Sequence, residues 1–214
     1  MNYKIGTRGS KLALAQADLV RTRLQEAYPE DTFELKVIRT KGDQLKDVPL
    51  GKIGDKGIFV REIEEQILEG KIQLGVHSMK DMPSQPALGL VFAKAWKRED
   101  ARDVLILRKE KSLSDLPEGA VIGTGSMRRK FQLLAMRRNI QIVDIRGNVD
   151  TRLKKMQEQK LDGIVLAAAG LKRLGMEQII TQYFEADEMI PAPAQGILAL
   201  ELQSANERLL SMLN

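Results

Sequence analysis

The sequence predicts an α/β protein with two domains. Strand-like apolar runs alternate with helix-like segments along the chain, which is typical of layered α/β folds. The 214 residues are enough for one large domain or two small ones. The last strand-like run, Ile197–Leu202, has no local partner strand, so we expect it to return to the first sheet. The chain would then cross between the domains twice, and two crossings form a hinge beside a ligand-binding cleft. The expected domains are residues 1–95 with 194–214, and residues 96–193.

The first domain is expected to begin with a strand at Tyr3–Thr7 and a helix that Ser10 caps and that ends near Ala27. The apolar spacing of this helix predicts a buried face made of Leu12, Ala15, Leu19 and Leu24. The polar connection Lys41–Lys56 is long, and loops of that length are more often functional than filler. The other expected elements are strands at Phe33–Thr40, Leu74–Val76 and Leu88–Ala93, and a helix through Val60, Ile63 and Ile67 that ends at Gly70.

The second domain repeats the alternation of apolar runs and amphipathic segments. Its expected strands are Val104–Leu107, Val121–Gly123, Gln141–Ile145 and Gly163–Ala167, and its expected helices are Ser126–Arg138, Val149–Gln159 and Leu171–Leu174. A rigid proline turn at Pro191–Gly196 then leads to the returning strand, and a last helix starts at Asn206.

The positive charge of the chain is concentrated in Gly123–Leu153. Between Gly123 and Arg152 there are seven Lys or Arg and two Asp, a net charge of 7 − 2 = +5, which equals the whole-chain excess of 34 − 29 = +5. The stretch predicts capture of a small ligand with several anionic groups, because turns that open helices offer free N–H groups and arginine binds carboxylates bidentately. The four arginines beside turns are Arg128, Arg129, Arg146 and Arg152.

A solvated basic face is the alternative for any single arginine. That alternative suits Arg137 and Arg138 better, because they end a predicted helix, where cations interact favourably with the helix dipole. A second turn of the same kind, with Arg8 and Ser10, opens the first helix. One such turn is weak evidence, but two of them, one in each domain, suggest paired anion-binding turns.

The segment His77–Asp81 follows the third predicted strand, and ligands of open α/β sheets gather beyond the carboxyl ends of strands. Asp81 comes after Lys80, and a carboxylate among cations stays ionised and can stabilise a cationic intermediate. The alternative is that Asp81 only forms the turn. His77 can be an acid or base, or a packed and hydrogen-bonded core residue. Lys56 lies on the long loop, where it can close over a ligand or simply be solvated.

Composition excludes several classes of site. The chain has no cysteine, so it forms no disulfides and has no thiolate metal site, which agrees with a reducing cytoplasm. One histidine excludes a multi-histidine metal cluster. Aromatic residues are 4% of the chain, too few for a nucleic-acid stacking platform, and no apolar run is long enough to span a membrane. The expected partner is therefore a small molecule, with no metal, no nucleic acid and no membrane.

Nine blocks of this sequence resemble the hydroxymethylbilane synthase (porphobilinogen deaminase) family. The resemblance covers nearly the whole chain, and the blocks together are highly specific. The blocks are IGTRGSKLALAQA (5–17), IRTKGD (38–43), DKGIFVREIEEQILEG (55–70), GVHSMKDMP (75–83), KREDARDVLI (97–106), IGTGSMRRKFQLL (122–134), DIRGNVDTRLKK (144–155), GIVLAAAGLKRLG (163–175) and PAPAQGILALE (191–201).

This resemblance implies a fold, an activity and a set of site residues. It implies two domains like type 2 periplasmic binding proteins, and a cytoplasmic transferase of tetrapyrrole (heme) biosynthesis that joins four porphobilinogen units with release of ammonia. Asp81 matches the catalytic aspartate, which assists loss of the amino group and stabilises the azafulvene cation. Lys56 matches the loop over the site. The residues that match positions binding the carboxylate side chains of the dipyrromethane cofactor and the pyrrole substrate are Arg8, Ser10, Lys80, Ser126, Arg128, Arg129, Arg146, Arg152 and Arg173.

The chain departs from the family pattern in one respect. Family members carry a third, C-terminal domain in which a cysteine holds dipyrromethane through a thioether, and this sequence has neither that domain nor any cysteine. Two readings stay open: an enzyme, expected as a monomer or with a separate third domain, and a non-catalytic two-domain module that binds anions or pyrroles. The intact Lys80-Asp81 pair favours the enzyme, and the missing cysteine favours the module or an inactive fragment.

Overall fold

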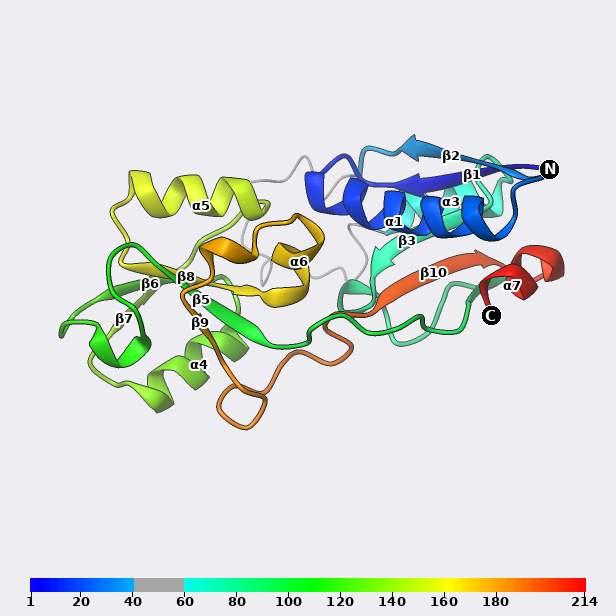
Figure 1. Cartoon of the computed structure of the whole chain (residues 1–214). Helices are drawn as coiled ribbons and strands as arrows, with labels where there is room; N and C mark the ends of the chain where they lie inside the picture. The colour runs from blue at the N-terminus through cyan, green and yellow to red at the C-terminus, as the bar shows by residue number, and fades with distance from the viewer. Residues whose placement is uncertain (41–59) are drawn as a thin grey trace. The chain divides into compact units, whose positions relative to one another are not determined.

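A computed structural model describes residues 1–40 and 60–214, and these residues fall into two compact α/β units (Figure 1). One unit contains Met1–Arg98 and Ile197–Asn214, and the other contains Glu99–Gly196. The predicted α/β class is confirmed. The domain limits expected from the sequence, at 95/96 and 193/194, stay a prediction. No helix in the described part of the chain is long and apolar enough to span a membrane.

The first unit is built on a five-stranded mixed sheet with the strand order β2-β1-β3-β10-β4. Strands β1, β2 and β3 are parallel, and β10 runs antiparallel to both β3 and β4. The last strand of the chain therefore lies in the first sheet, between two strands that precede it by more than a hundred residues. The strands are β1 (Asn2–Thr7), β2 (Thr32–Val37), β3 (Leu74–Ser78), β4 (Leu90–Phe92) and β10 (Leu198–Gln203).

Among the described residues, three helices and one 3-10 turn complete the first unit, and apolar clusters form around its sheet. One cluster joins β1, β3 and β10 to helices α1 and α7, and a smaller one around Ile63 and Ile67 packs α3 beside β3. Gly70 has φ +70, which permits the tight end of α3. The helices are α1 (Lys11–Ala27), α3 (Arg61–Leu68), η2 (Met79–Asp81) and α7 (Glu207–Leu213).

The predicted buried face of α1 was wrong by about one residue of rotation. Leu19 is 39% exposed, whereas Val20 beside it is completely buried. Leu24 is buried as predicted, whereas Leu12 and Ala15 are only partly buried. The residues buried on α1 are Ala13, Gln16, Ala17, Val20 and Leu24.

The second unit has a five-stranded sheet with the order β7-β6-β8-β5-β9. Strands β6, β7 and β8 are parallel, and β5 is antiparallel to β8 and β9. Both sheets therefore place three parallel strands before one antiparallel strand and one edge strand, although the sequence shows no internal repeat. The strands are β5 (Asp103–Leu107), β6 (Val121–Gly123), β7 (Gln141–Val143), β8 (Gly163–Ala167) and β9 (Gln182–Tyr183).

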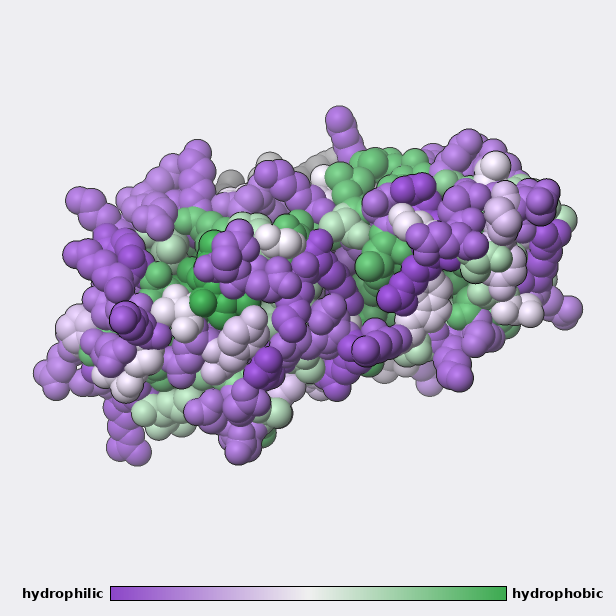
Figure 2. All heavy atoms as spheres, in the orientation of Figure 1, coloured by the Kyte–Doolittle hydropathy of each residue, from purple (hydrophilic) through white to green (hydrophobic). Residues whose placement is uncertain are grey.

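Two apolar clusters also form around the second sheet. One is built around Leu105, Leu133 and Phe184, and the other around Ile164, Met156 and Leu171. Hydrophilic residues cover most of the face seen in Figure 2, and apolar residues show only in patches between them. The helices of this unit are η3 (Leu113–Asp115), α4 (Met127–Met136), α5 (Val149–Glu158), α6 (Ala168–Arg173) and η4 (Glu177–Ile179).

Candidate catalytic and anion-binding residues

The first predicted anion-binding turn lies between β1 and α1. Ser10 is the N-cap of α1, and its hydroxyl accepts a hydrogen bond from the amide N–H of Ala13 over 3.2 Å. Arg8, two residues earlier, is partly exposed and has further contacts within the molecule. The N-terminal turn of α1 has no acidic residue, so it keeps the positive end of its helix dipole.

Asp81 lies in the 3-10 turn η2, directly after β3. Asp81 and Lys80 are both exposed. The turn is fixed at its base, because the N–H of Met79 donates to the carbonyl oxygen of Ile197 over 3.0 Å. In addition, the buried Gln16 side chain donates to the hydroxyl of Ser78 over 3.0 Å. An exposed carboxylate on a turn that is held from two sides is suited to meeting a ligand in a defined orientation.

His77 packs inside the first unit beside a second buried ionisable residue, Glu201 of β10. Its Nε2 lies 3.4 Å from Oε2 of Glu201, without hydrogen-bond geometry. Burial raises the pKa of nearby Glu64, and the charge of Glu201 adds to this effect while His77 opposes it. His77 is therefore packed in the core, but its Nε2 has no hydrogen-bond partner among the described residues, so the alternative of a packed and hydrogen-bonded residue is met only in its packing.

The second predicted anion-binding turn, Gly123–Ser126, joins β6 to α4. Ser126 is the N-cap of α4, and its hydroxyl accepts from the N–H of Arg129 over 3.4 Å. A Cβ atom on Gly125 would lie 2.9 Å from Oδ1 of Asp144 and 3.0 Å from the carbonyl oxygen of Ile145. Glycine is favoured here because a side chain would crowd the Asp144 carboxylate and the carbonyl oxygen of Ile145.

Arg128 and Arg129 both reach Asp103, the completely buried first residue of β5. Arg129 donates to Oδ1 of Asp103 through Nε (3.1 Å) and Nη2 (2.8 Å), and through Nη1 to the carbonyl oxygen of Val165 (3.0 Å). Nη1 of Arg128 lies 2.7 Å from Oδ2 of Asp103 and donates to the carbonyl oxygen of Ile190. The side-chain amide of Gln195 also donates to Oδ1 of Asp103 over 2.9 Å.

The two neighbouring arginines therefore differ in what they can offer a ligand. All three guanidinium nitrogens of Arg129 have partners, and only 7% of its side chain is exposed. Arg128 is 25% exposed, and within the described residues its Nε and Nη2 donate no hydrogen bond. The structure brings both predicted residues together, but only Arg128 keeps donors for an external carboxylate in this conformation.

Asp103 stays charged in spite of its burial. Burial on its own would raise the pKa of this carboxyl, but the positive charge of Arg129, with hydrogen bonds from both arginines and Gln195, lowers the pKa below its usual value. The sequence-based count of positive charge in Gly123–Leu153 missed this partner, because Asp103 lies outside that stretch. Part of the excess positive charge of this stretch is therefore neutralised inside the second unit.

Arg146 and Arg152 lie on either side of the turn that opens α5. Nε of Arg146 donates to Oδ2 of Asp144 over 3.1 Å, and Nε of Arg152 donates to the carbonyl oxygen of Gly147 over 2.8 Å. Gly147 has φ +114, a conformation that side chains rarely adopt. The turn thus brings two cations to the N-terminus of one helix, and both arginines have further contacts within the molecule.

Arg173 ends α6 and reaches the proline turn. Its Nη2 donates to the carbonyl oxygen of Gly196 over 2.6 Å. Burial lowers the pKa of Arg173, and the charge of Glu99 opposes this effect. Beside it, Lys172 lies 3.1 Å from Oδ2 of Asp100, and this ion pair raises the pKa of Lys172.

Sequence reasoning missed three residues that organise these cations: Asp100, Asp103 and Gln195. Asp100 accepts from the backbone N–H, Nε and Nη2 of Arg102, and these hydrogen bonds hold the pKa of the carboxyl well below its usual range. An available signal was the three acids of REDARD (98–103), which lead into an apolar strand. Lys56, predicted on the loop over the site, lies outside the described residues. Within the described ranges, no cluster of three His, Cys, Asp or Glu could hold a metal ion.

Solved structures similar to this one confirm the predicted likeness to type 2 periplasmic binding proteins. The periplasmic VFT2 domain of BvgS from Bordetella pertussis has a TM-score of 0.56 at 13% identity, covering 100% of this chain and 85% of that one. A probable amino-acid ABC transporter extracellular-binding protein, ytmK of Bacillus subtilis, has a TM-score of 0.57 at 11% identity, covering 100% and 88%. At these identities the likeness describes the fold alone.

Sequence comparison identifies the family as well as the fold. Residues 3–211 match the family described as porphobilinogen deaminase, dipyromethane cofactor binding domain. The porphobilinogen deaminase of Lachnospira eligens is 60% identical over 216 residues, which is 100% of this chain and 73% of the relative. That of Clostridioides difficile is 56% identical over 215 residues, 100% of this chain and 71% of the relative. The chain belongs to the porphobilinogen deaminase family.

Proposed function

We propose that this chain binds porphobilinogen and catalyses its condensation with release of ammonia, as a cytoplasmic transferase of tetrapyrrole biosynthesis. The observation that supports this most strongly is the family match over residues 3–211, at up to 60% identity with a named deaminase. The charge of the predicted binding residues also supports this proposal. Porphobilinogen carries two carboxylates, and the predicted binding residues are almost all cations or helix-capping serines.

In this proposal Asp81 is the catalytic residue. Loss of the protonated amino group as ammonia moves its positive charge onto the pyrrole ring as an azafulvene cation, and a fixed carboxylate beside the ring stabilises the charge in that new position. The exposed position of Asp81 on a turn anchored through Met79 and Ser78 supports this role. Lys80 beside it would bind a carboxylate of the substrate.

The remaining site residues are proposed to bind carboxylates. In the first unit, Arg8 would contribute its guanidinium and Ser10 would orient the helix N-terminus. In the second unit, Arg128 is the strongest candidate because of its available donors. Arg129, which Asp103 and Val165 hold, would act on the ligand by fixing the start of α4. The other proposed carboxylate-binding residues are Ser126, Arg146, Arg152 and Arg173.

The dipyrromethane group that gives the family domain its name fits this donor set in one respect. Its carboxylates match guanidinium and helix-terminus donors such as Arg128 and the turn at Ser126. Attachment through a thioether has no counterpart, because the sequence contains no cysteine. We therefore propose that the cations of residues 1–214 bind the carboxylates of the group, and that its covalent anchor lies outside these residues.

The test compares the wild-type chain with Asp81→Asn, using porphobilinogen binding by calorimetry and ammonia release on the same samples. We expect affinity to stay within about threefold and ammonia release to fall by about 10²–10³-fold, the range for removing one electrostatic stabiliser. Asp187→Asn, at another exposed acid, is the control and should change neither. Measurable ammonia release by wild type that Asp81→Asn matches would remove Asp81 from the mechanism.

A second function, a pyrrole-binding module without turnover, is favoured by the missing cysteine. Binding of porphobilinogen with no ammonia release would assign this function to the chain alone. Adding the part of the Lachnospira eligens relative that this chain does not cover, as a separate cofactor-loaded protein, would then test a third domain acting in trans. Failure of the wild-type chain to bind porphobilinogen would contradict both functions.

A further inference from the structure

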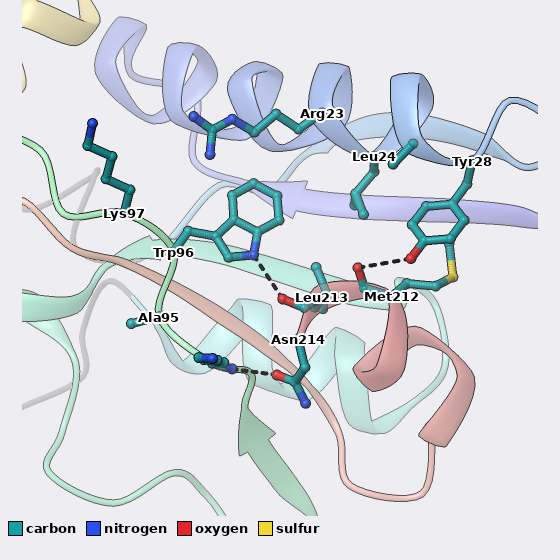
Figure 3. Close-up of a pocket in the computed structure, with 11 residues that line it drawn as sticks. Arg23, Leu24, Tyr28, Ala95, Trp96, Lys97, Met212, Leu213 and Asn214 are labelled. Atoms are coloured by element: carbon teal, nitrogen blue, oxygen red, sulfur yellow. Dashed lines mark hydrogen bonds between the residues drawn. The ribbon is translucent and has the colours of Figure 1, made fainter.

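A pocket of about 400 Å³ lies in the first unit, and none of its residues belongs to the proposed site (Figure 3). Its walls come from the second half of α1, from the segment that follows β4, and from the end of α7. The volume falls within the range of small-ligand pockets. The lining residues that matter here are Arg23, Tyr28, Lys94, Trp96, Lys97 and Met212.

Hydrogen bonds within the protein hold the pocket walls in place. The indole Nε1 of Trp96 donates to the carbonyl oxygen of Leu213 over 2.9 Å, and Figure 3 shows the ring pointing from its own strand connection toward the end of α7. The N–H of Lys94 donates to Oδ1 of Asn214 over 2.7 Å, and the hydroxyl of Tyr28 contacts the carbonyl oxygen of Met212 over 3.5 Å. The indole is therefore oriented without help from a ligand.

The charged side chains that line the pocket are all positive. Arg23, Lys94 and Lys97 are exposed, and no Asp or Glu lines the pocket. Across residues 1–40 and 60–214, none of these three side chains forms an ion pair with a carboxylate. The guanidinium carbon of Arg23 lies 5.4 Å from the centre of the Trp96 ring, which fixes one cation against the aromatic wall.

We propose that this pocket binds a small polyanion that carries a planar ring. The three cations would attract and orient two or more carboxylate or phosphate groups. Indole and guanidinium surfaces stack favourably on a flat ring, and Tyr28, Leu24 and Met212 supply the apolar wall. Because the walls are already ordered, little conformational entropy is lost when the ligand binds.

Trp96 is the only tryptophan of the chain, so its fluorescence reports on this pocket alone. The probe is pyromellitate, a planar ring with four carboxylates, titrated against the full chain with free N-acetyltryptophanamide as the inner-filter correction. We expect a saturable change in Trp96 fluorescence. Butanetetracarboxylate, which has the same number of carboxylates and no ring, should bind at least about tenfold more weakly.

The charge-reversal variant Lys94→Glu/Lys97→Glu should weaken pyromellitate binding by about tenfold or more. The control is Lys4→Glu/Lys109→Glu, which makes the same change in net charge at two exposed lysines outside the pocket and should keep the wild-type affinity. Circular dichroism checks that both variants fold. No saturable Trp96 response up to about 10 mM, equal weakening in both variants, or equal binding of the two acids would each overturn the proposal.

Discussion

Asp103 and Arg129 form a buried ion pair that joins β5 to the first turn of α4. Two hydrogen bonds, of 3.1 and 2.8 Å, connect Nε and Nη2 of the arginine to the same carboxylate oxygen. Gln195, from the proline turn, donates to that oxygen as well. Because one carboxylate contacts three segments of the second unit, it determines where Arg128 lies and thus where its available donors point.

The first prediction concerns the stability of this pair. Asp103→Asn should lower the free energy of unfolding by about 3–5 kcal/mol, because it leaves the buried guanidinium of Arg129 without a counter-charge. The double variant Asp103→Asn/Arg129→Gln should cost less than the sum of the two single changes by about 0.5–3 kcal/mol. Urea unfolding of the four proteins measures this coupling.

An exposed ion pair gives the matched control. Asp18 and Arg21 lie 2.7 Å apart on the outer face of α1, and Asp18→Asn should change stability by about 1 kcal/mol or less. If Asp103→Asn costs no more than Asp18→Asn, the pair at Asp103 is not the stabilising element described here.

The second prediction is a loss of stability in acid that depends on Asp103. The folded protein holds the pKa of this carboxyl below its usual value, so the unfolded chain binds the proton more readily. The contribution of the pair is therefore complete above the unfolded pKa of about 4 and is lost as pH falls through the lower, folded pKa. Unfolding free energies between about pH 6 and pH 3 should fall less steeply for Asp103→Asn than for wild type. Equal slopes would contradict the lowered pKa.

Among the described residues, the sequence was sufficient to predict the order of the α-helices, the returning strand and the other strands except the edge strand β9. The limits of β6 and β8 match the predicted ranges, because short apolar runs between turn residues allow little else. The face of α1 was predicted wrongly for a physical reason. Several rotations of α1 bury apolar residues, because Leu19 and Val20 are both apolar, and only the packing against the sheet decides that Val20 and not Leu19 is buried.

The local turns that carry the candidate site residues were predictable, but the pairing of these residues was not, and their binding of anions stays a prediction. Clustered arginines beside turns indicated anion binding, and the N-caps at Ser10 and Ser126 follow from local spacing. The partner of Arg129 could not be inferred, because Asp103 lies 26 residues earlier in the chain and reaches it only through the sheet. Glu201 facing His77 depends on long-range strand pairing in the same way.

The third prediction uses the ends of three helices. After α3, α5 and α6, paired hydrogen bonds close the last turn, and the residue that makes this possible has a positive φ. It is Gly70 after α3 and Gly175 after α6, but Lys160, with φ +53, after α5. Lys160→Gly should therefore raise the free energy of unfolding, by about 0.5–1 kcal/mol, because glycine adopts this conformation without steric cost.

The reciprocal change is the control for that prediction. Gly175→Ala, where open space surrounds the position, should destabilise by about 1 kcal/mol through backbone strain alone. Thermal melts of both variants and of wild type show whether each substitution raises or lowers the melting temperature. A Lys160→Gly protein that melts at a lower temperature than wild type would mean that contacts of the lysine side chain outweigh the backbone preference.

The fourth prediction separates Arg128 from its neighbour. Nη1 of Arg128 contacts Asp103 and the carbonyl oxygen of Ile190, whereas its Nε and Nη2 are available as donors to a ligand. Arg128→Leu should therefore weaken porphobilinogen binding by about 1.5–3 kcal/mol, the range for a hydrogen bond to a charged group. Arg128→Lys keeps the charge but loses the planar fork, and should fall between wild type and Arg128→Leu. Lys109→Leu, at an exposed lysine of the same unit, controls for the loss of one positive charge. Calorimetric titration gives the affinities, and urea unfolding of the same samples reports any loss of the internal contacts. If Arg128→Leu loses stability but binds porphobilinogen as wild type does, then Arg128 is only a structural partner of Asp103, and the carboxylates of the substrate are bound elsewhere.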